Sequence, residues 1–234
     1  MNKEQFILEV CNLGIEVTEE KLKKLDEFYN LLILWNEKIN LTTITAIQDV
    51  YLKHFYDSLT LFRVCDLTKD INLCDVGSGA GFPGIVLKIF FPNLKITLVD
   101  SLNKRVNYLN TIIKELGLVN IEAVHSRMED FSKVNEEKYD IITARAVANL
   151  SVLSEISVKA LKIQGKLVFM KALCDDELEM ILPKLSILGL KFDKVDKFLL
   201  PIEESNRSLI VFEKIKTTPN KYPRNIDKIK KNPL

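Results

Sequence analysis

From residue 71 onward, short apolar segments alternate with longer segments whose apolar positions recur at helical spacing. This alternation predicts an α/β domain, a mostly parallel sheet with helices on both faces. The last two strands are joined without a helix, which predicts an antiparallel pair at one edge. One expected helix, residues 175–189, contains Pro183. The seven expected strands span residues 71–76, 95–100, 120–126, 139–146, 165–172, 191–200 and 208–215.

The residues before this alternation have a helical pattern. Thr18 is expected to cap a helix whose first turn carries Glu19 and Glu20, because the helix dipole favours acidic side chains there. A further helix is expected from about Ile47 to Arg63. We therefore expect an N-terminal helical region packed on the main domain, the main α/β domain and a basic C-terminal tail, at residues 1–65, 66–214 and 215–234.

The segment LCDVGSGAGFPG, residues 73–84, holds four of the chain's 8 glycines directly behind the first strand. In an open α/β sheet ligands bind beyond the carboxyl ends of the strands, so glycines there indicate either a ligand that approaches the backbone closely or only a tight strand-to-helix turn. Gly77, Gly79 and Gly81 give G-x-G-x-G, whereas a dinucleotide-binding loop would have its third glycine where Phe82 stands. No G-K-[ST] follows, so the loop is not a P-loop.

Two aspartates accompany this loop. Asp75 precedes the glycines, and Asp100 ends the second strand, where an acid can accept hydrogen bonds from both hydroxyls of a ribose. No lysine or arginine lies between residues 73 and 87 to hold a cofactor phosphate. A cofactor with a ribose, a positive charge and no phosphate fits this pattern, and S-adenosylmethionine has all three properties.

Seven segments of the chain, taken together, are specific to one bacterial family. They are WNEKINLT, KHFYDSL, DVGSGAGFPGIVLKI, TLVDSLNKRVNYL, HSRMEDF, ITARAVANL and YPR. In these segments the chain resembles the bacterial 16S (small-subunit) ribosomal RNA guanine-N7 methyltransferases, also called glucose-inhibited division protein B. The resemblance covers nearly the whole chain, and its most specific part is the Phe-Pro-Gly that extends the glycine loop.

The resemblance implies a class I S-adenosylmethionine-dependent methyltransferase, which has a Rossmann-like, seven-stranded, mostly parallel sheet, here with an N-terminal helical extension. It implies methylation of N7 of a guanine at position 527, in the 530 loop of 16S rRNA. Arg145 and Lys171 are candidates for positioning the substrate, and no catalytic residue is assigned. The cofactor-binding residues that it implies, together with Asp75 from the residue pattern, are Asp75, Gly77, Gly79, Phe82, Asp100, Met128, Glu129 and Arg145.

The chemistry of a guanine N7 acceptor agrees with what the sequence lacks. N7 has a free lone pair and no proton, so proximity and orientation can supply most of the acceleration without a general base. Methylation of an exocyclic amine would call for an N/D-P-P-Y/F type of motif after the fourth strand, and carbon-5 methylation of a pyrimidine would require a cysteine nucleophile. Neither is present there: the end of that strand and the residues after it read TARAVANL. His54 and Asp57 share one helical face and are expected either to brace the helical region against the cofactor cleft or to form a surface hydrogen bond.

Charge is nearly balanced over the chain, with a net charge of +1, but seven basic residues and one acid lie between residues 214 and 231. This segment is either a solvated, loosely ordered end or an arm that binds rRNA phosphates. If it binds RNA, its removal should weaken RNA binding and barely change cofactor affinity. The expected partner is 16S rRNA or the small ribosomal subunit.

Other features bear on location and assembly. Four isolated cysteines without a CxxC pair, and no signal peptide, predict a cytoplasmic protein. No apolar run is long enough to span a bilayer, so no membrane partner is expected. The two histidines stand far apart, so no metal site is expected. Without a sustained heptad pattern, the expected state is a monomer.

Three other functions remain open from the sequence. The first is a methyltransferase for a small molecule or a protein, against which the basic tail and the breadth of the resemblance argue. The second is a nicotinamide-dependent oxidoreductase, which Phe82 at the third-glycine position disfavours. The third is a non-catalytic RNA-binding module on the same fold.

Overall fold

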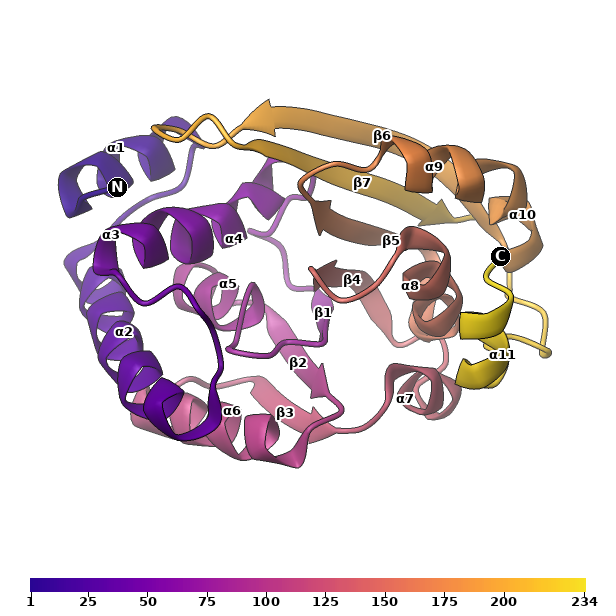
Figure 1. The fold of residues 1–234 in the computed structure, drawn as a ribbon, viewed down its shortest axis with the longest axis horizontal. Helices are drawn as coiled ribbons and strands as arrows, with labels where there is room; N and C mark the ends of the chain where they lie inside the picture. Colours follow the sequence, from indigo (N-terminus) through magenta and orange to yellow (C-terminus); the bar gives the residue numbers. More distant parts are fainter.

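The computed structural model describes residues 1–234 and is built around one seven-stranded sheet (Figure 1). The strand order is β3-β2-β1-β4-β5-β7-β6. Strands β1 to β5 pair in parallel, whereas β7 is antiparallel to both β5 and β6, which confirms the expected sheet. The strands are β1 (Asn72–Val76), β2 (Lys95–Asp100), β3 (Ile121–His125), β4 (Tyr139–Arg145), β5 (Leu161–Lys171), β6 (Leu190–Leu199) and β7 (Asn206–Lys214).

Helices cover both faces of this sheet, and a large hydrophobic cluster lies on each side. Helices α5 and α6, with α2 packed on both of them, cover one face, and helices α7 to α11 lie on the other (Figure 1). The helices that follow the first strand are α5 (Gly84–Phe90), α6 (Asn103–Glu115), α7 (Met128–Val134), α8 (Leu150–Ser157), α9 (Asp175–Ile181), α10 (Leu185–Leu188) and α11 (Ile226–Lys231).

The N-terminal residues form helices α1 (Lys3–Asn12) and α2 (Glu19–Ile39). The hydroxyl of Thr18 accepts a hydrogen bond from the backbone N–H of Lys21, so the expected cap is confirmed. The expected helix from Ile47 to Arg63 is also present, but its middle, Tyr51–Tyr56, is π-helical; α3 (Ile47–Val50) and α4 (Asp57–Leu59) flank it, and the last turn is a 3-10 helix. The apolar side chains of this region belong to the same hydrophobic cluster as α5 and α6.

Two segments differ from their sequence-based expectations. Pro183 divides the helix expected over residues 175–189 into α9 and α10, which are joined by a 3-10 turn, because proline has no N–H to donate within a helix. Part of the basic C-terminal segment is packed on the domain: Tyr222 and Ile229 are buried, and residues 226–231 form α11. Its first basic residue, Lys214, is buried and donates to the carbonyls of Val158 and Leu161.

Candidate active site

The glycine loop between β1 and α5 lies at the point where the strand order reverses. β1 and β4 are neighbours, and the chain continues from them towards opposite edges of the sheet, which is where open α/β sheets bind ligands. Gly77 and Gly79 have left-handed backbone conformations, with φ of +68° and +56°. A Cβ on Gly77 would lie 2.7 Å from Cγ2 of Val147, so both the conformation and the close packing require glycine there.

Asp100 holds this loop against the end of β2. Its Oδ2 accepts a hydrogen bond of 2.9 Å from the N–H of Gly79, and its Oδ1 accepts one of 2.9 Å from the N–H of Leu102. Arg105 approaches Oδ2 at 3.7 Å. Asp100 is buried, and each of its carboxylate oxygens keeps a second lone pair with which to accept a further hydrogen bond.

A hollow of about 200 Å³ lies beyond the carboxyl ends of β1 and β2. Of the residues expected to bind the cofactor, Gly77, Met128 and Glu129 come together in its wall, whereas Asp75, Gly79, Phe82, Asp100 and Arg145 do not line it. Eight of its fourteen lining residues are hydrophobic, as suits a purine ring. The full lining is Val76, Gly77, Val99, Ser101, Ser126, Arg127, Met128, Glu129, Val147, Ala148, Val152, Ile156, Ile226 and Lys230. We call it the cofactor hollow.

Asp75 is completely buried beneath the glycine loop. Its Oδ2 accepts a hydrogen bond of 3.0 Å from the N–H of Gly84, whereas its Oδ1 has no hydrogen-bond partner. Burial raises the pKa of Asp75 to about 6, although the nearby Arg145 acts in the opposite direction. An unpartnered buried carboxylate oxygen is stabilised by a cation in its vicinity, so these residues fit a positively charged cofactor.

Phe82 joins the glycine loop to the N-terminal helices. Its ring stacks on the imidazole of His54, with centroids 4.4 Å apart and planes at 18°, and lies 5.3 Å from the ring of Phe28. The guanidinium of Arg145 lies 5.2 Å from the same ring. Phe82 does not line the cofactor hollow and is only 5% exposed. Its side chain therefore positions the loop from behind.

A second hollow, of about 370 Å³, lies on the other side of the loop that follows β4. Arg145 and Arg207 both bond to one carboxylate there, Asp57, at 3.1 and 3.0 Å. Two guanidinium groups sharing one carboxylate leave an excess of positive charge. We call this the arginine hollow; its lining residues are Ile44, Lys53, His54, Asp57, Arg145, Ala146, Met170, Lys171, Ala172 and Arg207.

Arg145, in the arginine hollow, has N–H donors that make no hydrogen bond within the protein. Its Nη1 donates to the carbonyl of Lys53 at 3.0 Å and to Asp57, and its Nη2 lies 3.2 Å from Nδ1 of His54. A guanidinium has five N–H donors, so its Nε–H and one Nη2–H have no partner within the protein. These two donors can be offered to a substrate.

His54 is held as a neutral imidazole. Burial, together with the charge of Arg145, lowers its pKa to about 3. Because a guanidinium only donates, Nδ1 must accept from Arg145, and the proton is therefore on Nε2, which lies 3.1 Å from the hydroxyl of Thr42. The contact of 3.2 Å between Nδ1 and the carbonyl of Lys53 is then not a hydrogen bond. His54 and Asp57 thus brace the helical region against the cleft.

Lys171 lines the arginine hollow, but its charge is already paired. Its Nζ donates to the carbonyl of Ala148 and to both carboxylate oxygens of Glu177, each at 2.8 Å. Glu177 also accepts from the N–H of Leu150 at the start of α8. In this arrangement Lys171 fixes the loop after β4 and has no free donor for a substrate.

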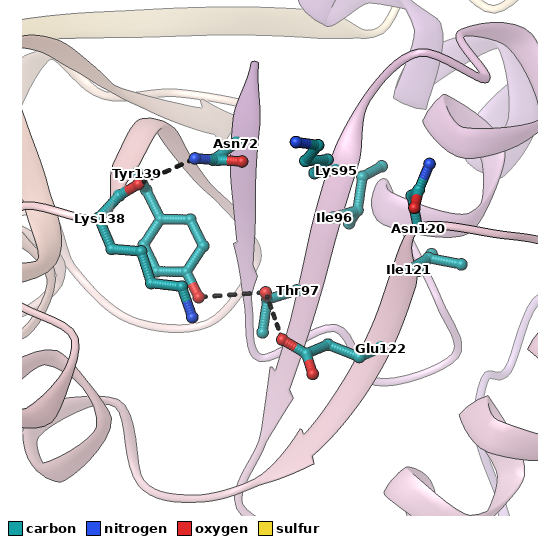
Figure 2. A pocket seen from close by; sticks show the side chains of 9 residues that line it. All are labelled: Asn72, Lys95, Ile96, Thr97, Asn120, Ile121, Glu122, Lys138 and Tyr139. Atoms are coloured by element: carbon teal, nitrogen blue, oxygen red, sulfur yellow. Dashed lines mark hydrogen bonds between the residues drawn. The ribbon is translucent and has the colours of Figure 1, made fainter. Parts of the chain in front are cut away.

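A third hollow, of about 350 Å³, lies at the other end of the strands, near the amino ends of β1 and β2 (Figure 2). The hydroxyl of Tyr139 donates to that of Thr97 at 3.1 Å, and the hydroxyl of Thr97 donates to Glu122 at 3.2 Å (Figure 2). These polar groups therefore satisfy one another. Since ligands of this fold bind at the carboxyl ends of the strands, the cofactor hollow and the arginine hollow, which share the residues after β4, form the candidate active site.

Several lining residues could not be found from the sequence. Arg207 lies 150 positions from Asp57 along the chain, on an antiparallel strand without a motif. Ile226 and Lys230 belong to the segment interpreted as a solvated or RNA-binding tail. No group of three His, Cys, Asp or Glu side chains could hold a metal ion. No helix is both long enough and apolar enough to cross a membrane.

The sheet order, the glycine loop and the acids at the ends of β1 and β2 define a class I S-adenosylmethionine-dependent methyltransferase. A solved structure described as a SAM-dependent methyltransferase from Aquifex aeolicus has the same fold, with a TM-score of 0.52 and 20% identity over 71% of this chain and 93% of that chain. The solved TrmN from Thermus thermophilus is similar in fold, with a TM-score of 0.52 and 17% identity over 68% of this chain and 48% of that chain.

Within this class, the chain belongs to the rRNA small subunit methyltransferase G family (GidB), whose family model matches residues 21–205. The "Ribosomal RNA small subunit methyltransferase G" of Lysinibacillus sphaericus is 47% identical over 100% of both chains. The protein of the same name from Listeria monocytogenes is 45% identical over 96% of this chain and 95% of its own. The resemblance seen in the sequence is confirmed.

Proposed function

We propose that this protein transfers the methyl group of S-adenosylmethionine to N7 of a guanine in the 530 loop of 16S rRNA, at position 527. The relatives that match at least 95% of both chains are named ribosomal RNA small subunit methyltransferases. The placement of the substrate rests on one observation: consecutive residues at the end of β4 line both hollows. Arg145 and Ala146 line the arginine hollow, and the next two residues, Val147 and Ala148, line the cofactor hollow.

In this proposal the cofactor hollow holds the adenosine, and the cofactor, when bound, supplies the methyl group. The target guanine enters the arginine hollow. Since the two hollows share the residues after β4, a methyl group and its acceptor can meet at their junction, and holding them there is most of the catalysis that N7 needs. His54 is neutral and both of its nitrogens are engaged, which agrees with a reaction without a general base.

The arginine hollow also suits the substrate electrostatically. The unpartnered donors of Arg145 can bond to guanine O6, which leaves the N7 lone pair free to react, or to a neighbouring phosphate. The excess charge of Arg145 and Arg207 around Asp57 favours a polyanion. Residues 1–65 then act as a region that braces these groups. The finer expectations of a cytoplasmic monomer are part of the same proposal.

Methyl transfer from radiolabelled S-adenosylmethionine tests the function directly. Naked 16S rRNA, assembly intermediates and 30S subunits should be compared as acceptors, and N7-methylguanine should be mapped by strand cleavage at the modified base. We expect label on one guanine of the 530 loop in at least one of these acceptors. Label on another atom or another RNA, or only on protein or small molecules, would contradict the proposal.

Asp100 gives a first test of the cofactor site. Asp100→Ala is expected to weaken S-adenosylmethionine binding by about 1.5–3 kcal/mol, the value of hydrogen bonds to a charged group. Asp100→Asn should lose less, because the amide oxygen can still accept from the N–H of Gly79. Calorimetric titration measures both. An unchanged dissociation constant in Asp100→Ala would remove the ribose assignment.

Asp75 predicts a pH dependence of cofactor binding. Its carboxyl has a pKa of about 6 in the free protein, and a cationic cofactor favours the ionised form, so protons compete with the cofactor at lower pH. The dissociation constant should rise about tenfold per pH unit below this pKa. In Asp75→Asn, binding should be weak and nearly independent of pH. Titrations between about pH 5 and 8 check this, and a parallel slope in Asp75→Asn would show that another group is responsible.

Unfolding curves cannot replace these titrations, because two groups act in opposite directions. The pKa of Asp75 is raised, so its contribution to stability is present at low pH and is lost as the pH rises from 3.8 through about 6. The pKa of His54 is lowered, so its contribution is present above 6.5 and is lost as the pH falls from 6.5 towards about 3. The pH dependence of cofactor affinity reports on the Asp75 carboxylate, because His54 does not line the cofactor hollow.

A further inference from the structure

We infer that the C-terminal segment, residues 222–230, forms one wall of the S-adenosylmethionine site, with Ile226 and Lys230 as contact residues. Both side chains line the cofactor hollow, as do Gly77 of the glycine loop, Met128 and Glu129. The segment lies beyond residue 205, where the match to the family model ends. Figure 1 shows α11 beside α8, near the carboxyl-terminal residue. The inference rests on the proposed cofactor.

A buried ion pair fixes this segment in place. Glu155 of α8 is completely buried, and Arg224 donates to it three times: from its backbone N at 3.0 Å, from Nε at 2.8 Å and from Nη2 at 2.6 Å. Glu155 lies next to Ile156 on α8, and Ile156 itself lines the hollow. A bidentate pair of this kind is geometrically specific, so it sets the distance between the segment and the cofactor wall.

The apolar side of α11 continues this attachment. Ile229 and Lys230 follow Ile226 by three and four positions and therefore lie on the same side of the helix as Ile226. Ile229 is fully buried in the same hydrophobic cluster as Met128, and Ile226 packs at its edge. Lys228 is exposed and does not line the hollow. One face of α11 therefore serves the cofactor hollow, and the other is free.

This arrangement gives the two lining residues separate roles. Ile226 offers an apolar surface to the adenine, and Lys230 can cover its edge with the aliphatic stem while the exposed ammonium stays at the rim, within reach of purine nitrogen acceptors. The segment thus contributes to cofactor binding even if its outer lysines also attract RNA. Removal of residues after Lys214 should then weaken the cofactor site, contrary to the sequence-based expectation.

The test compares single variants on α11 by calorimetric titration with S-adenosylmethionine. Ile226→Ala and Lys230→Ala should each raise the dissociation constant by about threefold to tenfold, and the matched control Lys228→Ala should leave it unchanged. Melting temperatures without cofactor separate this effect from unfolding. The conservative variant Arg224→Lys, which keeps the charge beside Glu155 but loses the bidentate geometry, should also weaken binding, although Arg224 does not line the hollow.

The outcomes distinguish this inference from the proposed function. If the unchanged protein fails to bind S-adenosylmethionine, the proposed function itself is wrong. If the unchanged protein binds it and both Ile226→Ala and Lys230→Ala bind equally well, the inference alone is overturned. A loss of rRNA affinity in Lys230→Ala at an unchanged cofactor dissociation constant would also overturn it, because the residue would then belong to the RNA surface.

Discussion

Single-turnover methyl transfer is expected to fall by about 100-fold or more in Arg145→Lys, because two charge-assisted hydrogen bonds to guanine or phosphate, at about 1.5–3 kcal/mol each, are lost. The guanidinium bonds to Lys53, Asp57 and His54 and still has two donors for the substrate. A lysine keeps the charge but has a single nitrogen, which cannot make these contacts together. Since Arg145 does not line the cofactor hollow, the cofactor dissociation constant should change by no more than about threefold.

Arg63→Lys is a matched control for this change. Arg63 also forms a bidentate pair, with Asp196 at 2.7 and 3.2 Å, but lies away from both hollows. Its replacement should leave the rate unchanged. Rates on the same rRNA acceptor and melting temperatures should be measured for both variants. Equal rates in Arg145→Lys and the unchanged protein would remove Arg145 from the substrate site.

Gly77→Val is expected to abolish detectable S-adenosylmethionine binding. The new side chain would start 2.7 Å from Val147, and its branches would project from the wall of the cofactor hollow. It would also occupy a left-handed conformation, φ +68°, that β-branched residues avoid. Equilibrium dialysis against labelled cofactor measures the loss.

Gly117→Val separates blocked binding from backbone strain. Gly117 has a similar φ of +57°, but nothing lies within 4 Å of a Cβ built there. Both variants therefore carry a strain of about 1–3 kcal/mol, and only Gly77→Val should lose the cofactor. Cofactor binding by Gly77→Val with normal affinity would mean that the adenosine does not lie against this loop.

Local patterns predicted most of the fold. The seven strands follow from short apolar segments separated by helical ones, and the cap at Thr18 follows from the residue type and the acids behind it. The glycine loop and Asp100 were predicted to lie close together because the switch point of an α/β sheet is fixed by topology, and the N–H of Gly79 does donate to Asp100. The break at Pro183 was underestimated, although its missing N–H is itself a local signal.

The remainder of the site depends on contacts between distant parts of the chain. Asp57 pairs with Arg145 and Arg207, which follow it by 88 and 150 positions, and no periodicity reports such a distance. A lysine-rich end also looks the same in sequence whether it is solvated or packed. Only the fold shows that Arg224 meets a buried carboxylate and that Ile226 reaches the cofactor hollow.

The position of β7 between β5 and β6 has a consequence for how the chain folds during synthesis. The buried middle of β5, Leu167 to Met170, pairs with β4 on one side and with β7 on the other. Of the seven strands, β7 is synthesised last. Until residues 206–214 leave the ribosome, this apolar strand presents an open edge, to which another nascent chain can add a strand. Translation that stalls before Asn206 therefore produces a chain prone to aggregate, and rapid completion of the last strand protects the protein.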